Sequence, residues 1–274
     1  MLFKFVLAAF LLLALRMLYR FRTAQFYLKS ILFAALVGFF SALSLPISIV
    51  CWILCKPGHG NWATGRAFYY GASYLLGLKF EVVGDTGDLL EQTKPAVILC
   101  NHQATIDVML LGALFPTQCS IVVKKVLKYY PFLGMFLLLN QAIFIDRKNT
   151  KSALQNMAKA AESMKKKKLS VFMFPEGTRA HSKENTLLPF KKGGFHLAVQ
   201  AQAPIIPVVV ENYSWAYSSR SRWFPGGTIR VRVLPPIETA GKTEADVEAL
   251  TQQTREVMTE ALVEISKQRH VKDD

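Results

Sequence analysis

The sequence is poor in cysteine. Its 274 residues include four, Cys51, Cys55, Cys100 and Cys119, too few for a disulfide framework in a chain of this length. No cysteine and histidine spacing matches a zinc module, and no strand carries the aromatic pattern of an RNA-binding domain. These absences argue against a disulfide scaffold and against nucleic acid as a partner.

Acidic residues are also scarce. The chain has 19 Asp and Glu against 33 Lys and Arg, a net charge of +14. Such a balance favours an anionic partner, and without a nucleic-acid module the candidates are a membrane surface or a phosphorylated molecule. Hydrophobic residues make up 51% of the chain, which excludes disorder and supports a substantial core.

The first 56 residues read as a membrane-anchoring segment. Residues 30–54 carry no charge, and a helix needs about 20 such residues to cross a bilayer. A basic collar precedes them, formed by Arg20, Arg22 and Lys29 within residues 19–29. We therefore predict N-terminal membrane-embedded helices over residues 1–56 and one globular domain over residues 57–274, a length too short for two full domains.

Two topologies of this anchor are open. The positive-inside rule places the collar in the cytosol and sends the domain after Cys55 to the far side. Alternatively, Pro46 breaks the apolar segment into a re-entrant hairpin, which leaves collar and domain on one face. A cleaved signal peptide over residues 1–15 is a third interpretation, but no small-x-small cleavage site follows it.

Beyond residue 56, short apolar strands alternate with helical patterns. The predicted strands are residues 80–83, 96–100, 120–123, 142–145, 170–174, 205–210 and 228–234, and the predicted helices are residues 63–78, 150–167 and 243–267. This alternation predicts an α/β fold, a mixed sheet flanked by helices on both faces. Four lysines, residues 165–168, close one helix, where the macrodipole favours cations and a membrane surface could be contacted.

The strongest functional pattern is His102 followed by Asp107, directly after strand 96–100. Five residues apart on one helix, the two side chains would point about 140° away from each other. The spacing works if His102 lies in a strand-to-helix turn, Thr105 caps a helix that starts at Ile106, and Asp107 reaches back from its first turn. Such a pair makes the imidazole a general base.

The nucleophile for this base is not evident. No serine or cysteine lies in a nucleophile-elbow context, and Cys100, two residues from His102, fits packing in the strand better than attack. We therefore expect the base to activate a hydroxyl group of the substrate.

A second polar turn follows strand 170–174. Gly177 permits close approach of the backbone, Thr178 offers a hydroxyl group, and Arg179 offers a fork for phosphate oxygens. A surface salt bridge between Glu176 and Arg179 is the simpler interpretation of the same residues. Because carboxyl ends of parallel strands meet at one edge, we expect this turn beside His102.

Further charged residues follow other strands. Lys125 comes after strand 120–123, and Asp146 with Arg147 ends strand 142–145. Lys191 and Lys192 precede two glycines, a pattern typical of an anion site at a helix start, although exposed lysines there are common. One base and several cations at one sheet edge predict acyl transfer to a hydroxyl group of a phosphorylated molecule.

At this point the chain resembles the glycerolipid acyltransferases. The matching segments are Asn101-His102-x4-Asp107, Phe144-Ile145-Asp146-Arg147, Phe174-Pro175-Glu176-Gly177-Thr178-Arg179 and Pro204-Ile205-Ile206-Pro207-Val208, which resemble the family's four blocks in order. Lys125-x-Leu127-x3-Pro131-x2-Gly134 is similar to the branch that makes phosphatidic acid. The resemblance covers roughly residues 60–240, and it departs at Asn140, where family members often have glycine.

The resemblance implies a role for each matched residue. His102 would be the general base and Asp107 its orienting partner. The acceptor phosphate would be held by Glu176, Gly177, Thr178 and Arg179, with Lys125 and Arg147 as supporting cations. Residues 205–208 would be structural or line the acyl path.

The implied reaction moves an acyl group from acyl-CoA to the sn-2 hydroxyl of lysophosphatidic acid and gives phosphatidic acid in phospholipid biosynthesis. Coenzyme A leaves readily as a thiolate, so we expect no metal and no cofactor beyond the acyl-CoA co-substrate. Both substrates carry acyl chains, which agrees with contact to membrane lipids. By resemblance, the membrane is that of the endoplasmic reticulum, with the lipid droplet as the alternative.

Three rival functions are open. The acceptor could be glycerol 3-phosphate, lysocardiolipin or another lysophospholipid. A metal-dependent phosphohydrolase could use His102, Asp107 and Glu176 as ligands, although their spacing is not that of a metal site and the many cations would repel a metal. A non-catalytic membrane adaptor would explain the apolar N-terminus and the charge, but not the base–carboxylate pair.

Overall fold

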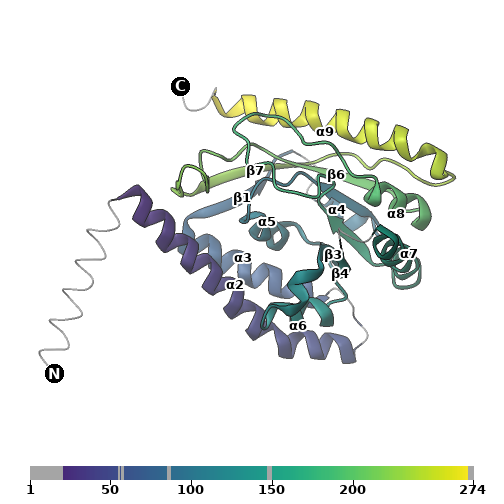
Figure 1. Ribbon diagram of the computed structural model, residues 1–274, viewed down its shortest axis with the longest axis horizontal. Coiled ribbons are helices and arrows are strands. Elements are labelled where there is room, and N and C mark those ends of the chain that lie inside the picture. The colour runs from purple at the N-terminus through teal and green to yellow at the C-terminus, as the bar shows by residue number, and fades with distance from the viewer. Residues whose placement is uncertain (1–20, 55, 57–58, 85–87, 147–149, 271–274) are drawn as a thin grey trace, which may run out of the picture.

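The computed structural model describes residues 21–54, 56, 59–84, 88–146 and 150–270. Within them one sheet is surrounded by helices (Figure 1). In chain order the elements are α2 (Arg22–Ile53), α3 (His59–Leu76), β1 (Leu78–Val82), α4 (Leu89–Gln92), β2 (Val97–Cys100), α5 (Asp107–Leu114), β3 (Cys119–Lys124), η1 (Lys125–Tyr129), α6 (Leu133–Leu139), β4 (Ile143–Ile145), α7 (Thr150–Lys167), β5 (Ser170–Met173), α8 (Gly193–Ala201), β6 (Ile205–Val210), β7 (Gly227–Val233), η2 (Glu244–Asp246) and α9 (Val247–His270).

The strands form a seven-stranded mixed sheet in the order β1-β7-β6-β2-β5-β3-β4. All neighbours run parallel except β6 and β7, which are antiparallel. The five strands from β6 to β4 therefore end at the same edge. The turns that follow β2, β5 and β6 are next to one another there, because these three strands are adjacent.

Helices cover both faces of the sheet, as the sequence predicts. On one face Ile98, Cys100 and Phe172 pack in a core with α2, α3 and α5. On the other face Val97 and Leu99 pack with α7, α8 and the start of α9. Because its central strands are buried on both sides, they are continuous apolar runs without alternation.

Most predicted elements are present with their ends moved by a few residues. The helix over residues 150–167 is α7 without change, whereas the predicted helix 63–78 begins earlier, as α3, and ends at Leu76. The closing helix α9 starts at Val247 after a 3₁₀ turn that Thr243 caps.

The apolar N-terminal helix α2 is continuous over 32 residues, with Pro46 in its interior. The break at Pro46 that one of the two anchor topologies requires is therefore absent. By length and composition α2 is able to cross a membrane, yet it packs against α3 and α6 along one side. A proline inside a helix removes one backbone hydrogen bond and clashes with the preceding turn, which costs about 3 kcal/mol of stability. The contacts with α3 and α6 offset that cost.

The start of α2 also contacts the globular domain. The Lys29 Nζ atom donates to the carbonyl oxygens of Leu76 at 2.8 Å and Pro225 at 2.9 Å, and this side chain is buried. The Arg22 guanidinium lies 4.6 Å from the centre of the Trp223 ring. Two residues of the basic collar thus hold the helix to the domain. Arg20, the third, lies outside the described residues.

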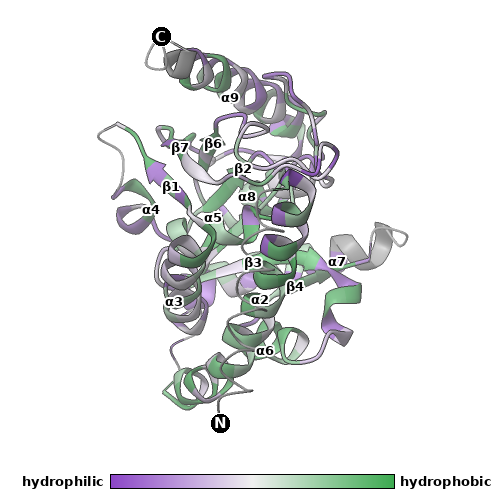
Figure 2. Cartoon of the chain, turned by 90° about the vertical axis from the view of Figure 1, so that its left-hand side faces the viewer, coloured by the Kyte–Doolittle hydropathy of each residue, from purple (hydrophilic) through white to green (hydrophobic). Residues whose placement is uncertain are grey.

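One side of the molecule is apolar. In the described part of the chain, the large hydrophobic side chains that remain exposed all lie between Phe21 and Leu138, on α2, α3, α5, η1, α6 and the segments that join them. Figure 2 shows the hydrophobic ribbon of α2 and α6 on the side away from α9. An exposed apolar surface of this extent is typical of contact with a membrane or a partner.

Candidate active site

The turn after β2 is fixed to β6 by two amide side chains. Asn101 Nδ2 donates to the Val210 carbonyl at 3.0 Å, and Asn101 Oδ1 accepts from the Val210 N–H at 2.8 Å. Gln103 Nε2 donates to the Val210 and Glu211 carbonyls. The side chain of Asn101 thus continues the strand pairing, which lets the main chain leave the sheet at His102.

His102 and Asp107 form the predicted pair. The His102 Nδ1 and Asp107 Oδ2 atoms are 2.7 Å apart, and Oδ2 also accepts the N–H groups of Gln103 and Ala104. The carboxylate only accepts, so Nδ1 carries the proton and Nε2 remains the basic nitrogen. The helix itself begins at Asp107 with no side-chain cap, so the predicted cap at Thr105 is wrong.

The sequence reasoning missed a third member of this group, Tyr213. Its hydroxyl donates to the other carboxylate oxygen of Asp107, and the side chain is fully buried. Burial, with the nearby Asp107 charge, raises the pKa of Tyr213 well above its ordinary value, so the phenol stays protonated. The sequence did contain a clue to Tyr213, because residues 211–213 follow the predicted strand 205–210 and so lie at the same sheet edge.

Glu176 joins the His102 turn to the turn after β5. Its Oε1 accepts the His102 N–H at 2.8 Å and its Oε2 accepts the Leu188 N–H at 3.2 Å, with the residue 3% exposed. Burial raises the pKa of Glu176, and the two N–H donors oppose that rise. Since both oxygens face backbone donors, Glu176 acts on the site by holding these two turns together.

The imidazole of His102 lies on the ring of Phe174. The ring centres are 4.1 Å apart and the planes differ by 19°. The side chain of His102 is 17% exposed, against 2% for Asp107, so solvent reaches the histidine rather than its carboxylate partner. Stacking and the Asp107 bond together fix the direction of Nε2.

Cys100 is not placed to be a nucleophile. It is fully buried in β2, and burial raises the pKa of its thiol well above the ordinary value. A neutral, inaccessible thiol cannot act as a nucleophile. This agrees with the packing interpretation.

The predicted phosphate turn lies directly beside His102. Gly177 has φ +65°, and a Cβ atom there would lie 3.0 Å from the Lys191 side chain, so that lysine covers the turn. The Ala180 N–H donates to the His102 carbonyl at 2.9 Å, so Arg179 is one residue and Thr178 two residues before a direct contact with the histidine. Both side chains are exposed and able to meet a ligand.

Two residues that the sequence did not single out, His181 and Arg220, lie near this turn. Burial lowers the pKa of His181, and the charges of Arg179, Arg220 and His102 lower it further. Arg179 also opposes the rise that burial causes in the pKa of Tyr217. Positive charge thus converges on the mouth of the site, which is what an anionic group needs.

Of the other predicted residues, one lies farther along the same sheet edge and one lies outside the described chain. Lys125 Nζ is 3.5 Å from Asp146 Oδ2 on the surface after β3 and β4, and its described contacts do not reach the His102 turn. Arg147 lies outside the described residues. Asn140 is buried and donates to Ser48 of α2 at 2.8 Å, so it holds α6 to the N-terminal helix.

An apolar cavity of about 170 Å³ lies next to the site, and Val108, the residue after Asp107, is part of its lining. It lies between α2, α3, α5 and α6, and its lining includes Val108, Leu111, Phe68, Val123 and Phe136. Its walls are almost wholly apolar, which fits a hydrocarbon chain and not a polar group.

A buried carboxylate, an oriented imidazole and a cationic turn thus lie together at one sheet edge. A family model described as Acyltransferase matches residues 82–211. The chain is 39% identical over 243 residues to the 1-acyl-sn-glycerol-3-phosphate acyltransferase of Saccharomyces cerevisiae, covering 88% of this chain and 78% of the relative. It is 37% identical to the human 1-acyl-sn-glycerol-3-phosphate acyltransferase beta, covering 95% and 92%.

The fold has a solved counterpart. The crystal structure of the 1-acyl-sn-glycerophosphate (LPA) acyltransferase PlsC from Thermotoga maritima matches with a TM-score of 0.71 at 19% identity, over 89% of this chain and 98% of that one. This chain belongs to the 1-acyl-sn-glycerol-3-phosphate acyltransferase family, and it is an enzyme that transfers acyl groups.

Proposed function

We propose that this enzyme transfers an acyl group from acyl-CoA to the sn-2 hydroxyl of lysophosphatidic acid and so makes phosphatidic acid. The observation that carries the proposal is the contact between the two turns: Glu176 and Ala180 bond the backbone of His102, so the base and Arg179 share one site. A base beside cations suits an alcohol that carries a phosphate. The names of the relatives support the same acceptor.

The reaction follows from the orientation of the imidazole. His102 Nε2 takes the proton of the acceptor hydroxyl as its oxygen attacks the thioester carbonyl carbon. The imidazolium is stabilised by Asp107. The C–S bond then breaks, and the coenzyme A thiolate leaves and takes up a proton. Neither an acyl-enzyme nor an oxidant is needed to balance these steps.

The lysolipid phosphate lies against the turn in this proposal. Arg179 provides a two-pronged donor, and Lys191 adds charge from above Gly177. Lys125 and Arg147 are kept as outer supporting cations. Glu176 acts through the turns that it joins.

An acyl chain occupies the apolar cavity beside Asp107, and the substrates arrive from the bilayer. The apolar surface of α2, α3 and α6 faces the membrane, which we take to be that of the endoplasmic reticulum. Lipid substrates then need not cross water to reach either the cavity or the turn.

The test is release of coenzyme A thiol by the purified full chain with oleoyl-CoA and a panel of acceptors. We expect release with lysophosphatidic acid and little with monoacylglycerol, which has the hydroxyl group but no phosphate. Equal rates with the two acceptors would contradict the phosphate role of the turn. Mass spectrometry of the product identifies the acylated position.

A further inference from the structure

The lysines that close α7 are not used by the active site. Of residues 165–168, Lys166 and Lys167 line a cavity of about 410 Å³. The other walls come from the end of α2, with Lys56, and from the end of α6, with Asn140.

This cavity lies at the opposite edge of the sheet from His102. Gln118 and Gln141, which line it, precede β3 and β4, whereas His102 follows the carboxyl end of β2. All three strands run in the same direction. The full length of the sheet therefore separates this cavity from the reacting groups.

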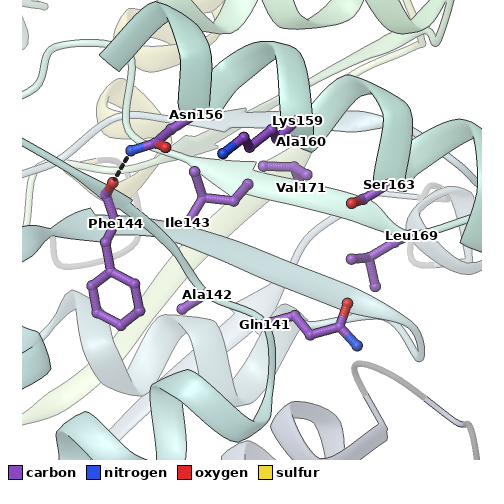
Figure 3. A pocket seen from close by; sticks show the side chains of 10 residues that line it. All are labelled: Gln141, Ala142, Ile143, Phe144, Asn156, Lys159, Ala160, Ser163, Leu169 and Val171. Carbon is purple, nitrogen blue, oxygen red and sulfur yellow. Dashed lines mark hydrogen bonds between the residues drawn. The ribbon is translucent and has the colours of Figure 1, made fainter. Parts of the chain in front are cut away.

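Among the described residues, the lining carries positive charge and no negative charge. Three lysines line the cavity, and Gln141 Oε1 accepts from Lys167 Nζ at 2.8 Å. An adjoining cavity of about 270 Å³ shares Gln141 and also has no acidic lining residue (Figure 3). There Lys159 and Ser163 extend from α7, on the helix face that also presents Lys166 and Lys167.

The other wall of the cavity is apolar. Cys51, Trp52 and Leu139 form it, and Trp52 is 65% exposed. Ile53 and Leu54, next to Trp52, are exposed too and end the apolar surface of α2. Tryptophan beside lysines, where an apolar surface ends, is typical of the membrane–water boundary.

We propose that this cavity binds the phosphate headgroup of an anionic glycerophospholipid of the bilayer. Lys56, Lys166 and Lys167 hold the phosphate, and the wall of Trp52 and Leu139 contacts the first part of the acyl chains. The site is not catalytic. It would hold the end of α2 at the membrane surface, while near the start of that helix Phe26 packs on Tyr217 of the globular domain.

The test measures binding of a fluorescent phosphatidylglycerol by the full chain in phosphatidylcholine nanodiscs. This lipid is neither substrate nor product of the proposed reaction, so the result does not depend on that proposal. The double variant Lys166→Gln/Lys167→Gln should bind it roughly 10-fold more weakly. Its matched control is Lys165→Gln/Lys168→Gln, which removes the same charge from the same run and should stay within about twofold.

Equal weakening in both double variants would overturn the site, because general surface charge would then explain the binding. So would unchanged binding in both. Displacement of the lipid by millimolar glycerol 3-phosphate would show a free-anion site and overturn the lipid assignment. Thiol release by Lys166→Gln/Lys167→Gln in detergent should equal that of the unmodified chain. If the proposed acyl transfer is wrong, neither the variant nor the unmodified chain will release thiol, whatever the lipid binding.

Discussion

At the scale of single residues, the site is organised around the carboxylate of Asp107. It accepts from His102 Nδ1, two backbone N–H groups and the Tyr213 hydroxyl. The two backbone donors fix where the carboxylate lies, and Tyr213 fixes how it is turned. A second role of Tyr213 follows, since each donor withdraws some of the negative charge that stabilises the imidazolium.

Replacing Tyr213 by phenylalanine tests this positioning role. Without the hydroxyl, Asp107 carries more negative charge toward the imidazolium, so the acid limb of the pH profile of kcat/KM should move to higher pH. We expect kcat to fall roughly 10-fold, since a hydrogen bond to a charged group is lost. The measurement is thiol release with lysophosphatidic acid across the pH range.

Tyr217→Phe is the control for that variant. Tyr217 is also buried, but it has no described hydrogen bond to Asp107, and its ring packs on Phe26 and Phe224. A pH profile of Tyr213→Phe that coincides with that of Tyr217→Phe, whatever the loss in rate, would refute the positioning role.

Arg179 is tested through the acceptor. Arg179→Gln should raise the KM for lysophosphatidic acid roughly 10- to 100-fold, because a charge-assisted bond to phosphate is lost. The KM for oleoyl-CoA should change little. Lys183→Gln, which removes an exposed charge from the same loop, is the control. An equal effect on both substrates would argue against a specific phosphate contact.

The pKa of His181 offers a second test of phosphate binding near Arg179. This pKa is lowered by burial and by Arg179, Arg220 and His102, so a phosphate bound among these cations should raise it. The check is an NMR titration of the His181 ring with and without lysophosphatidic acid. Absence of a shift in the unmodified chain, or a shift that persists in Arg179→Gln, would place the phosphate elsewhere.

At the scale of elements, the order of strands and polar turns in the sequence was enough to predict the sheet and the His102–Asp107 pair. Parallel strands bring their ends together, so residues from distant segments could be grouped without coordinates. Tyr213 fits that rule too, but it lies three residues beyond the end of β6, and no spacing shows that its hydroxyl turns back to Asp107. The side-chain pairing of Asn101 with β6 depends on local geometry that no spacing reveals.

The course of α2 could not be predicted, for a physical reason. A proline disfavours a helix locally, but Phe40, before Pro46, packs on Phe68 of α3, and Ser48, after it, accepts from Asn140 at the end of α6. Lys29 reads as a membrane-surface cation in the sequence, whereas three-dimensional contacts give it two carbonyl partners inside. Contacts between distant segments therefore determine both the continuity of α2 at Pro46 and the burial of Lys29.

The cavity between α2, α3, α5 and α6 allows a prediction about the length of the acyl chain. Val108 lines the cavity and is 39% exposed, so Val108→Trp should narrow the cavity from its solvent-facing side without disturbing the core. We expect the rate with oleoyl-CoA to fall roughly 10-fold relative to decanoyl-CoA, because buried methylene groups are lost. Val126→Trp changes an exposed valine outside the cavity and should leave the ratio unchanged. A ratio unaffected by Val108→Trp would remove the acyl chain from this cavity.

At the scale of the whole molecule, the apolar side and the polar side divide the structure. α2, α3 and α6 carry the exposed apolar side chains, and α9 lies on the other side (Figure 2). We expect a fluorophore at Met135 to be quenched by lipids that carry a quencher on the acyl chain. One at Glu256, on α9, should not be quenched. Equal quenching at both positions would contradict this orientation.

The central claim is that the imidazole of residue 102 deprotonates a lipid alcohol. It is tested most directly by thiol release from oleoyl-CoA with His102→Ala at saturating lysophosphatidic acid. The variant should still bind the lysolipid, while turnover falls roughly 10²- to 10⁴-fold, the usual contribution of a general base. Turnover equal to that of the unmodified chain would contradict the account.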